Sequence, residues 1–276
     1  MITAGDTIGA LQSALPLDPL ENRILLCHAL GLSRVGLVTQ SDRALTAEEA
    51  AQLATLVERR KFGEPIAYIV GRREFYGLDF EVNDSVLIPR PDTELLVELA
   101  LERLPQQGRL LDMGTGSGAI AVSVAHTRPD AAVTALDYSG AALDVARANA
   151  NAHGAAVRFL RSDWFSNLDA ETFDVIASNP PYIASGDEHL SRGDLRFEPN
   201  MALTDRADGL AALRIIIGGA GRHLAPNGWL LLEHGYDQAA QVRALLEAQG
   251  YADVQSWRDL AGIERVSGGR FATRNA

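Results

Sequence analysis

One stretch near the middle of the chain restricts the possible folds more than any other. Residues 109–125 read RLLDMGTGSGAIAVSVA, an apolar strand followed by a turn with three glycines and then by an apolar helix. This order is typical of a parallel sheet in which a ligand approaches the backbone at the carboxyl end of a strand. Gly114, Gly116 and Gly118 lack the Cβ atoms that would block such an approach. The stretch therefore predicts an α/β domain with a ligand site at this turn.

Strand-like and helical segments alternate after residue 89, which is typical of βαβ units. We expect a Rossmann-like domain whose seven-stranded, mostly parallel sheet has helices on both faces. A long amphipathic helix is expected to begin at Pro91. No clear helix separates the last two strands, so we expect an antiparallel pair at that edge. The strands are expected near residues 109–113, 132–137, 156–160, 173–178, 228–232, 252–257 and 270–274.

The N-terminal region, residues 1–70, is predicted to form a small helical domain. Apolar residues recur at spacings of three and four in LENRILLCHALG and in TAEEAAQLATLVERRKFG. Thr46 and Glu49 form a capping box at the start of the second segment, and Gly63 is placed to end it. The following REFYGLDFEV suits a short hairpin. We therefore expect residues 71–88 to be a β-hairpin linker and residues 89–276 to be the α/β domain.

Composition excludes some classes of protein. The chain has 276 residues, of which 47% are hydrophobic, and a formal net charge of -11. A protein that holds nucleic acid nonspecifically needs clustered Lys and Arg, so no direct nucleic-acid partner is expected. No apolar run approaches the length of a membrane span, and no basic flank precedes an apolar run at the N-terminus. We expect a cytoplasmic protein, a monomer, without contact to a membrane.

Two features after the glycine loop fit a bound nucleoside. Asp137 ends the predicted strand AAVTALD, about 20 residues after the last glycine, where a carboxylate can accept both hydroxyls of a ribose. This fits NAD and S-adenosylmethionine equally, and capping of the next helix is the competing interpretation. In RSDWF, Asp163 can bind an exocyclic amine and Trp164 can face an adenine ring, although a tryptophan that fills the core is an alternative.

The tetrapeptide Asn179-Pro180-Pro181-Tyr182 directly follows the predicted strand FDVIA. The side-chain oxygen of Asn179 and the carbonyl of Pro180 are two acceptors, whose directions the prolines fix. Two fixed acceptors suit an NH₂ group on a planar carbon, because they position the delocalised lone pair of its nitrogen for attack on a methyl group. Tyr182 can lie flat on the planar substrate group. The competing interpretation is a simple Asn-Pro turn.

The histidines give no reason to expect a metal. His189, His223 and His234 lack the Cys or His companions of a zinc site. We therefore predict chemistry without a bound metal.

Four motifs together resemble class I S-adenosylmethionine-dependent methyltransferases that act on NH₂ groups. They are LDMGTGSGAIA, ALDYS, SDWF and SNPPYI, in this order and spacing. Three longer stretches are similar to the release-factor glutamine N5-methyltransferase family (PrmC/HemK): RRKFGEPIAYIVGRREFYGLDFEVNDSVLIPRPDTELLVE, RFEPNMALTDRADGL and WLLLEHGYDQ. The resemblance covers nearly the whole chain, including the helical N-terminal region.

The resemblance implies methyl transfer from S-adenosyl-L-methionine, with S-adenosyl-L-homocysteine as product, to the glutamine amide in the Gly-Gly-Gln loop of bacterial peptide chain release factors. This modification modulates translation termination. The N-terminal helices would then recognise the release factor. The resemblance implies that the donor is bound by Gly114, Thr115, Gly116, Ser117, Gly118, Asp137, Trp164 and Asn179. It implies that the glutamine is held by Asn179, Pro180, Pro181 and Tyr182, of which Asn179, Pro180 and Tyr182 serve the chemistry.

Other functions stay open at this point. A sister enzyme methylates a glutamine of a large-subunit ribosomal protein, although its entry segment reads more like PRSPI.E than PRPDTE. An adenine N6-methyltransferase would meet the same NH₂ geometry. A dehydrogenase could use the glycine loop for NAD, but the tetrapeptide has no role in hydride transfer. The family pattern D.AG.DRV is replaced by residues 259–266, DLAGIERV, and we expect this departure at Ile263 and Glu264 to lie away from the chemistry.

Overall fold

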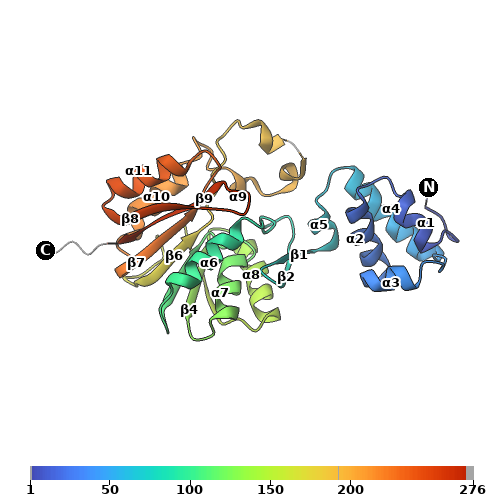
Figure 1. Cartoon of the computed structure of the whole chain (residues 1–276), viewed down its shortest axis with the longest axis horizontal. Helices are drawn as coiled ribbons and strands as arrows, with labels where there is room; N and C mark the ends of the chain where they lie inside the picture. Colours follow the sequence, from blue (N-terminus) through green and yellow to red (C-terminus); the bar gives the residue numbers. More distant parts are fainter. Residues whose placement is uncertain (1, 192, 272–276) are drawn as a thin grey trace. The chain divides into compact units, whose positions relative to one another are not determined.

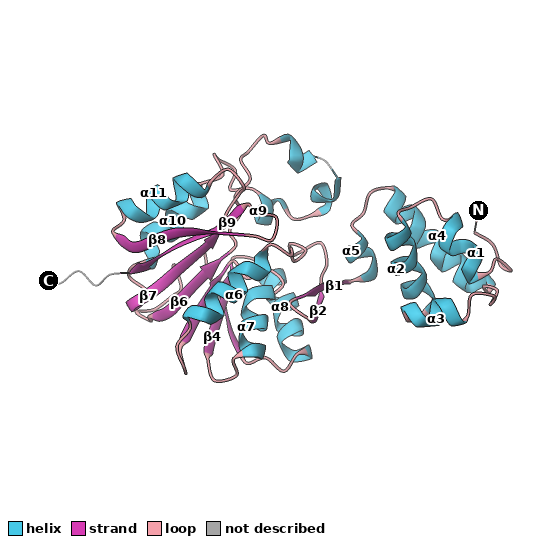
Figure 2. Cartoon of the chain, viewed as in Figure 1, coloured by secondary structure: helices cyan, strands magenta, loops and turns pink. Residues whose placement is uncertain are grey.

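The computed structural model describes residues 2–191 and 193–271. The chain divides into two compact units, Met1–Arg72 and Arg73–Ala276 (Figure 1). The first unit is helical and the second combines a sheet with helices (Figure 2).

The first unit consists of short helices around an apolar core. The helices are α1 (Ile8–Ala14), α2 (Pro19–Leu30), α3 (Arg34–Thr39), α4 (Ala47–Lys61) and α5 (Ile66–Val70). The predicted capping box is confirmed, since the Glu49 amide donates to Thr46 Oγ1 at 3.2 Å and the Thr46 amide donates to Glu49 Oε2 at 2.9 Å. Gly63 follows the end of α4 with φ of 100°, as predicted. Leu25, Leu26 and Leu53 lie fully buried between these helices.

The second unit contains a seven-stranded sheet in the order β5-β4-β3-β6-β7-β9-β8. The strands are β3 (Arg109–Met113), β4 (Ala132–Asp137), β5 (Val157–Arg161), β6 (Phe173–Ser178), β7 (Leu224–Glu233), β8 (Tyr251–Arg258) and β9 (Glu264–Phe271). Strands β3 to β7 run parallel, and β9 is antiparallel to both β7 and β8. The predicted seven-stranded, mostly parallel sheet with an antiparallel edge is confirmed.

Helices cover both faces of this sheet, because its central strands are apolar on both sides. Neighbouring residues of β3 show the division: Leu110 belongs to the cluster under α6 (Thr93–Arg103) and α7 (Ala119–Thr127), whereas Leu111 belongs to the cluster under α10 (Ala211–Ala220) and α11 (Ala239–Ala248). Helix α8 (Gly140–Ala152) lies on the α7 side. Figure 2 shows the two helical layers with the sheet between them. Short helices η1 (Glu188–Ser191), η2 (Gly193–Phe197) and α9 (Asn200–Leu203) lie between β6 and α10.

The ends of several elements differ from the sequence-based expectation. The last strand is β9 at Glu264–Phe271, so the expected range 270–274 is wrong at its start, and residues 272–274 lie outside the described residues. Gly268 and Gly269 obscured this strand, because glycine is rare in strands. A Cβ at Gly268 would come within 2.4 Å of the Leu230 carbonyl oxygen, so close strand packing requires glycine there.

Two other expected boundaries shift by a few residues. Strand β7 starts at Leu224, four residues before the expected 228. Helix α6 begins at Thr93 rather than at Pro91. Pro91 lies in a turn in which the Thr93 amide donates to the Arg90 carbonyl at 3.1 Å. Such one- or two-residue differences at helix starts reflect local turns that the sequence pattern does not resolve.

The predicted hairpin is confirmed as β1 (Arg72–Phe75) and β2 (Leu78–Glu81). Its Phe75 and Phe80 rings are fully buried and pack edge to face, with centroids 5.9 Å apart. The side chain of Asn149 on α8 holds the hairpin in place. Its Oδ1 accepts from the Glu81 amide at 2.7 Å, and its Nδ2 donates to the Glu81 carbonyl at 3.0 Å. The same Nδ2 also donates to the Ser117 carbonyl at 2.9 Å. One buried amide therefore joins the hairpin, α8 and the glycine loop.

We predict that Asn149→Ala lowers the free energy of unfolding by about 2 to 4 kcal/mol, since it leaves buried backbone groups without partners. Asn151→Ala on the same helix is the control, because that side chain is exposed and we expect a change within about 0.5 kcal/mol. Urea unfolding followed by circular dichroism measures both. Equal stabilities of the two variants would contradict this account.

Candidate functional site

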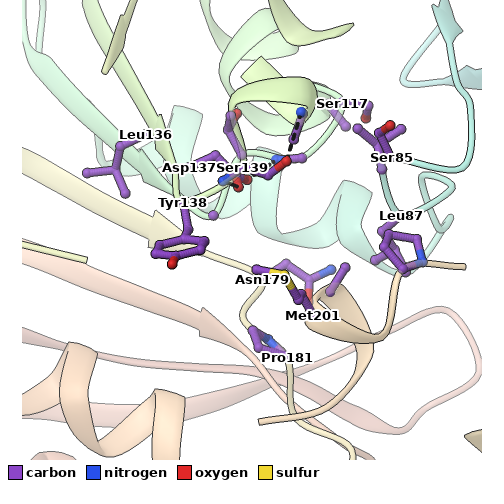
Figure 3. A pocket seen from close by; sticks show the side chains of 18 of the residues that line it. Ser85, Leu87, Ser117, Leu136, Asp137, Tyr138, Ser139, Asn179, Pro181 and Met201 are labelled. Carbon is purple, nitrogen blue, oxygen red and sulfur yellow. Dashed lines mark hydrogen bonds between the residues drawn. The ribbon is translucent and has the colours of Figure 1, made fainter. Parts of the chain in front are cut away.

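A cavity of about 540 Å³ lies at the carboxyl ends of β3, β4, β5 and β6. The strand order of the sheet changes direction between β3 and β6. In open α/β sheets, ligands bind at the carboxyl ends of the strands at such a switch point. Met113 and Ser178 are paired neighbours on β3 and β6, so the glycine loop and Asn179 leave the sheet side by side. Figure 3 shows Asp137, Tyr138 and Ser139 from one strand end and Asn179 and Pro181 from another around this cavity.

The glycine loop forms one wall of the cavity through Gly114, Thr115, Gly116 and Ser117. Gly114 and Gly116 have φ of 72° and 55°, and a Cβ at either would meet no atom within 4 Å. Side chains there would extend into open space, and the positive φ would strain them. Gly118, which the sequence also predicted for ligand binding, does not line the cavity. A Cβ at Gly118 would press on Ala146 and Val122 at 3.1 Å, so this glycine permits close packing of α7 and α8.

Asp112 lies directly below the loop, and the sequence analysis did not select it. It is fully buried, and its Oδ2 accepts from Thr115 Oγ1 at 2.6 Å and from the Ala121 amide at 3.1 Å. Burial raises the pKa of Asp112 to about 7, although both hydrogen bonds lower it. The carboxyl therefore holds the loop against the start of α7. The sequence did contain a signal for Asp112: it is an acidic residue in an otherwise apolar strand, two residues before the first glycine of the loop.

Asp137 points into the cavity and also braces the glycine loop. Its Oδ2 accepts from the Gly116 amide at 2.9 Å, and its Oδ1 accepts from the Ser139 amide at 2.8 Å. Burial raises the pKa of Asp137, and these backbone amides lower it. The side chain that caps α8 is that of Ser139, which accepts from the Ala142 amide at 3.2 Å. The Asp137 carboxyl is thus a cavity residue rather than the cap of α8.

Two aromatic side chains lie beside Asp137 on the cavity wall. Trp164 lines the cavity and also packs against the apolar cluster under α10, and its contact with an adenine ring stays a prediction. Its φ of 46° is strained for a bulky residue, and Ser162 Oγ donates to its carbonyl at 2.7 Å. Tyr138 lines the cavity with a side chain that is 56% exposed, and the sequence analysis missed it. Asp163 lines the cavity as well.

The tetrapeptide after β6 is divided between the cavity and the protein interior. Asn179 and Pro181 line the cavity, whereas Pro180 is buried and Tyr182 is not among the lining residues. Asn179 Nδ2 donates to Thr93 Oγ1 at 3.2 Å, and the Tyr182 hydroxyl donates to Glu233 Oε1 at 3.4 Å. Burial, followed by the charge of Glu233, raises the pKa of Tyr182. The stacking of Tyr182 on a substrate remains a prediction.

The backbone of the tetrapeptide is fixed by buried neighbours. Gln238 Nε2 donates to the Tyr182 carbonyl at 3.0 Å, and Gln238 Oε1 accepts from the Gly235 amide at 2.8 Å. A Cβ at Gly209 would come within 2.6 Å of the same Tyr182 carbonyl oxygen. These contacts make the end of β6 rigid.

The opposite wall joins two stretches that are more than 100 residues apart. Glu198, whose side chain is fully buried, pairs with Arg90 and accepts from the Ile88 amide at 3.1 Å. Around this pair, the cavity is lined by Ser85, Val86, Leu87, Pro89, Arg90, Thr93, Pro199, Met201, Ala202, Thr204, Asp205 and Arg206. The sequence analysis assigned no role to Arg90 or Glu94. Glu94 Oε1 accepts from the Tyr76 amide at 3.0 Å and so fastens the hairpin to α6.

Arg265, which directly follows the departure at Ile263 and Glu264, contacts the segment that precedes α6. Arg265 Nε is 3.3 Å from Asp259 Oδ2 and 3.4 Å from Asp92 Oδ2, and Asp92 precedes Thr93. Neither Ile263 nor Glu264, at which the chain departs from the family pattern, is among the residues that line the cavity, and the expectation that this departure lies away from the chemistry stays a prediction. Glu264 faces outward to Arg243 and Arg258, at 3.4 and 3.7 Å.

Within residues 2–191 and 193–271, no three His, Cys, Asp or Glu side chains lie close enough together to hold a metal ion.

Two protein families match the chain. The family described as "Methyltransferase small domain" matches residues 91–194, and the "PrmC N-terminal domain" matches residues 7–71. A solved methyltransferase structure from Pyrococcus furiosus has a TM-score of 0.56 at 21% identity and covers 79% of this chain and 99% of its own. This likeness shows the fold.

Curated relatives identify the family. The release factor glutamine methyltransferase of Burkholderia pseudomallei is 57% identical in an alignment of 274 positions that covers 96% of this chain and 96% of its own. The enzyme of the same name from Neisseria gonorrhoeae is 51% identical and covers 92% of this chain and 94% of its own. At this identity and coverage, with the glycine loop, Asp137 and the Asn179 tetrapeptide gathered at one cavity, the chain belongs to the release factor glutamine methyltransferase family.

Proposed function

We propose that this protein transfers a methyl group from S-adenosyl-L-methionine to the side-chain amide nitrogen (N5) of the glutamine in the Gly-Gly-Gln loop of bacterial peptide chain release factors. The observation that carries the proposal is the placement of Asn179 beside the glycine loop at one cavity, in a chain 57% identical to a relative of that name. Methylation of this loop would modulate translation termination, and S-adenosyl-L-homocysteine would be the second product.

The cavity fits the donor chemically. Gly114 and Gly116 leave room for a ligand against the backbone, and the Asp137 carboxyl is an acceptor for ribose hydroxyls. Tyr138 and Trp164 offer ring surfaces for the adenine, and Asp163 can accept from its amine. Ser117 and Thr115 complete the loop wall, while Gly118 acts through packing. When bound, S-adenosylmethionine supplies a methyl group on a sulfonium centre.

We assign the residues after β6 to the binding and orientation of the substrate amide, which is a weak nucleophile. The lone pair of a glutamine amide nitrogen is delocalised, so the protein has to orient it and stabilise the positive charge that develops on it. Asn179 Nδ2 is engaged by Thr93, which leaves Oδ1 to accept from the substrate NH₂. We assign the second acceptor to the Pro180 carbonyl and contact with the planar amide to Pro181 and Tyr182. The bond from nitrogen to the methyl carbon forms as the carbon–sulfur bond breaks, its electron pair staying on sulfur, and the nitrogen loses a proton.

We assign recognition of the release factor to the helical residues 1–70, joined by a hairpin linker at 71–88 to a methyltransferase domain at 89–276. The match of residues 7–71 to the PrmC N-terminal domain supports the first assignment. Action as a monomer, in the cytoplasm and without nucleic acid, remains a prediction. Across the described ranges, no helix has the length and apolar character needed to span a bilayer.

Incubation of the protein with labelled methyl donor and, separately, release factor, large-subunit ribosomal proteins and nucleic acid tests the substrate. We expect label in the release factor, and in the glutamine of its Gly-Gly-Gln loop when the tryptic peptide is sequenced by mass spectrometry. A release factor in which that glutamine is replaced by asparagine is the control. Label in ribosomal protein or nucleic acid, with none in release factor, would contradict the proposal.

Asp137→Ala should weaken binding of S-adenosyl-L-homocysteine by at least about tenfold, because the carboxyl both faces the cavity and braces Gly116. Isothermal titration calorimetry measures the affinity. Asp144→Ala is the matched control, since Asp144 on α8 forms a solvent-exposed ion pair with Arg147 and does not line the cavity. An unchanged affinity in the Asp137→Ala variant would show that Asp137 does not contribute to donor binding.

Asn179→Ala should lower the turnover number by at least about a hundredfold, because the substrate nitrogen loses its side-chain acceptor. We expect the unfolding midpoint to stay close to that of the natural protein and donor binding to fall far less than turnover. Single-turnover methylation of release factor, beside calorimetric donor binding, separates the two effects. Near-normal turnover would refute the role assigned to Asn179.

A further inference from the structure

A closed circuit of contacts surrounds the tetrapeptide end of the cavity, and one buried carboxyl joins its two arms. We call this circuit the substrate frame, and it consists of residues 87–93, 179–183 and 198–204. The Glu198 side chain is fully buried. Its Oε1 accepts from Arg90 Nη2, and its Oε2 accepts from the Ile88 amide at 3.1 Å. Each oxygen of the carboxyl therefore holds the segment before α6.

The first arm of the substrate frame runs from Glu198 to Asn179. Arg90, which pairs with Glu198, accepts at its carbonyl from the Thr93 amide at 3.1 Å. The hydroxyl of Thr93, a buried residue, accepts from Asn179 Nδ2 at 3.2 Å. One turn, at residues 90–93, thus lies between the buried carboxyl and the side chain that we assign to the substrate amide.

The second arm returns from Glu198 to the other end of the tetrapeptide. Helix α9 begins two residues after Glu198. The amide of Ile183, the residue after the tetrapeptide, donates to the Leu203 carbonyl at 3.0 Å, and Ile183 forms a parallel bridge with Thr204. Both ends of the tetrapeptide are therefore connected to Glu198 by hydrogen bonds and short stretches of backbone.

The Glu198–Arg90 pair fixes a geometry more than it adds stability. A buried ion pair contributes little net stability, because both charges lose hydration, but it can fix one relative position of the segments that carry them. Leu87 of the first arm and Met201 of the second line the cavity together with Asn179 (Figure 3). Glu198 itself is not a lining residue. Its effect on a ligand therefore has to act through the residues that it holds.

We propose, on the basis of the proposed function, that Glu198 is a positioning residue for the substrate amide. Its pairing with Arg90 holds the turn in which Thr93 accepts from Asn179, and this bond leaves Asn179 Oδ1 for the substrate NH₂. Without the Glu198 carboxylate, the two arms lose their junction and the Asn179 amide loses its fixed orientation. The glycine loop keeps its own contact with Asp137, so turnover depends on Glu198 more than donor binding does.

The first test needs no substrate. Selective ¹⁵N labelling of asparagine gives a side-chain NH₂ signal for Asn179, assigned by its loss in Asn179→Ala. We expect Glu198→Gln to shift this signal and to leave the signal of Asn149, which contacts the glycine loop, in place. Glu171→Gln is the matched control, because Glu171 pairs with two arginines and does not line the cavity. An unmoved Asn179 signal in Glu198→Gln overturns the proposal, whatever the enzyme methylates.

The second test uses turnover of release factor. We expect Glu198→Gln to lower the turnover number by about tenfold to a hundredfold, with the affinity for S-adenosyl-L-homocysteine within about twofold of the natural protein. Thr93→Val removes the hydroxyl that links the frame to Asn179. In that background Glu198→Gln should cost less than about threefold more, because both changes act on the same bond. Glu171→Gln should leave turnover unchanged.

A variant without either charge guards against poor folding. Glu198→Gln leaves Arg90 without its partner, whereas the double variant Arg90→Gln, Glu198→Gln leaves no unpaired ion at this position. We expect the double variant to show the same shift of the Asn179 signal and the same loss of turnover. Near-normal turnover with an unmoved signal in the double variant also overturns the proposal.

The outcomes separate this proposal from the proposed function. If the natural protein methylates no release factor, the proposed function fails, and the Asn179 signal still decides whether Glu198 sets the orientation of that amide. Multiplicative losses when Glu198→Gln is combined with Thr93→Val would show that Glu198 does not act through Thr93. A loss of donor affinity as large as the loss of turnover would show that Glu198 shapes the whole cavity, which contradicts a role confined to the substrate amide.

Discussion

The pairing of β3 with β6 is the contact on which the site depends. Met113 lies opposite Ser178, and Ser178 Oγ donates to the Met113 carbonyl at 2.7 Å. The glycine loop starts one residue after the first and Asn179 one residue after the second. Because parallel strands place their carboxyl ends at one edge, this single register brings a donor loop and a substrate tetrapeptide together. A shift of one residue would turn these side chains to the other face of the sheet.

Three buried or half-buried acidic side chains lie at or next to the cavity. Burial raises the pKa of Asp112, Asp137 and Glu233, and each of these carboxyls accepts a hydrogen bond from a loop at the site. Asp112 holds Thr115, Asp137 holds Gly116, and Glu233 holds Tyr182. A carboxylate is a strong acceptor for several donors at once, so two of these carboxyls hold the glycine loop and the third holds the tetrapeptide after β6. Such fixed segments suit a reaction in which a poor nucleophile has to be held in line.

A second feature of the site is that its outer wall is made by segments far apart in the chain. Arg90 and Glu198 pair across more than 100 residues, and Asp92 meets Arg265 from the last strand. These contacts surround Thr93, which joins Asn179 to the interior. Residues 85–93 and 199–206, from two of the stretches whose resemblance to the family the sequence analysis noted, thus supply lining residues of this wall.

The sequence by itself determined the parallel sheet, the capping box of α4, the hairpin and the cavity positions of Gly116, Asp137 and Asn179, because these depend on local patterns of spacing and turn chemistry. It could not find Thr93, Tyr138 or Glu233, whose roles arise from neighbours distant in the chain. It also misplaced the start of the last strand, because glycine is rare in strands and the need for Gly268 became visible only where a Cβ would collide with the Leu230 carbonyl oxygen. Only the tertiary structure decided which predicted residues face the cavity. Asn179 and Pro181 do, whereas Gly118 allows α7 and α8 to pack closely and the Tyr182 hydroxyl donates to the buried Glu233. The physical reason is that a motif fixes where the backbone goes, while burial and the nearest hydrogen-bond partner decide where each side chain points.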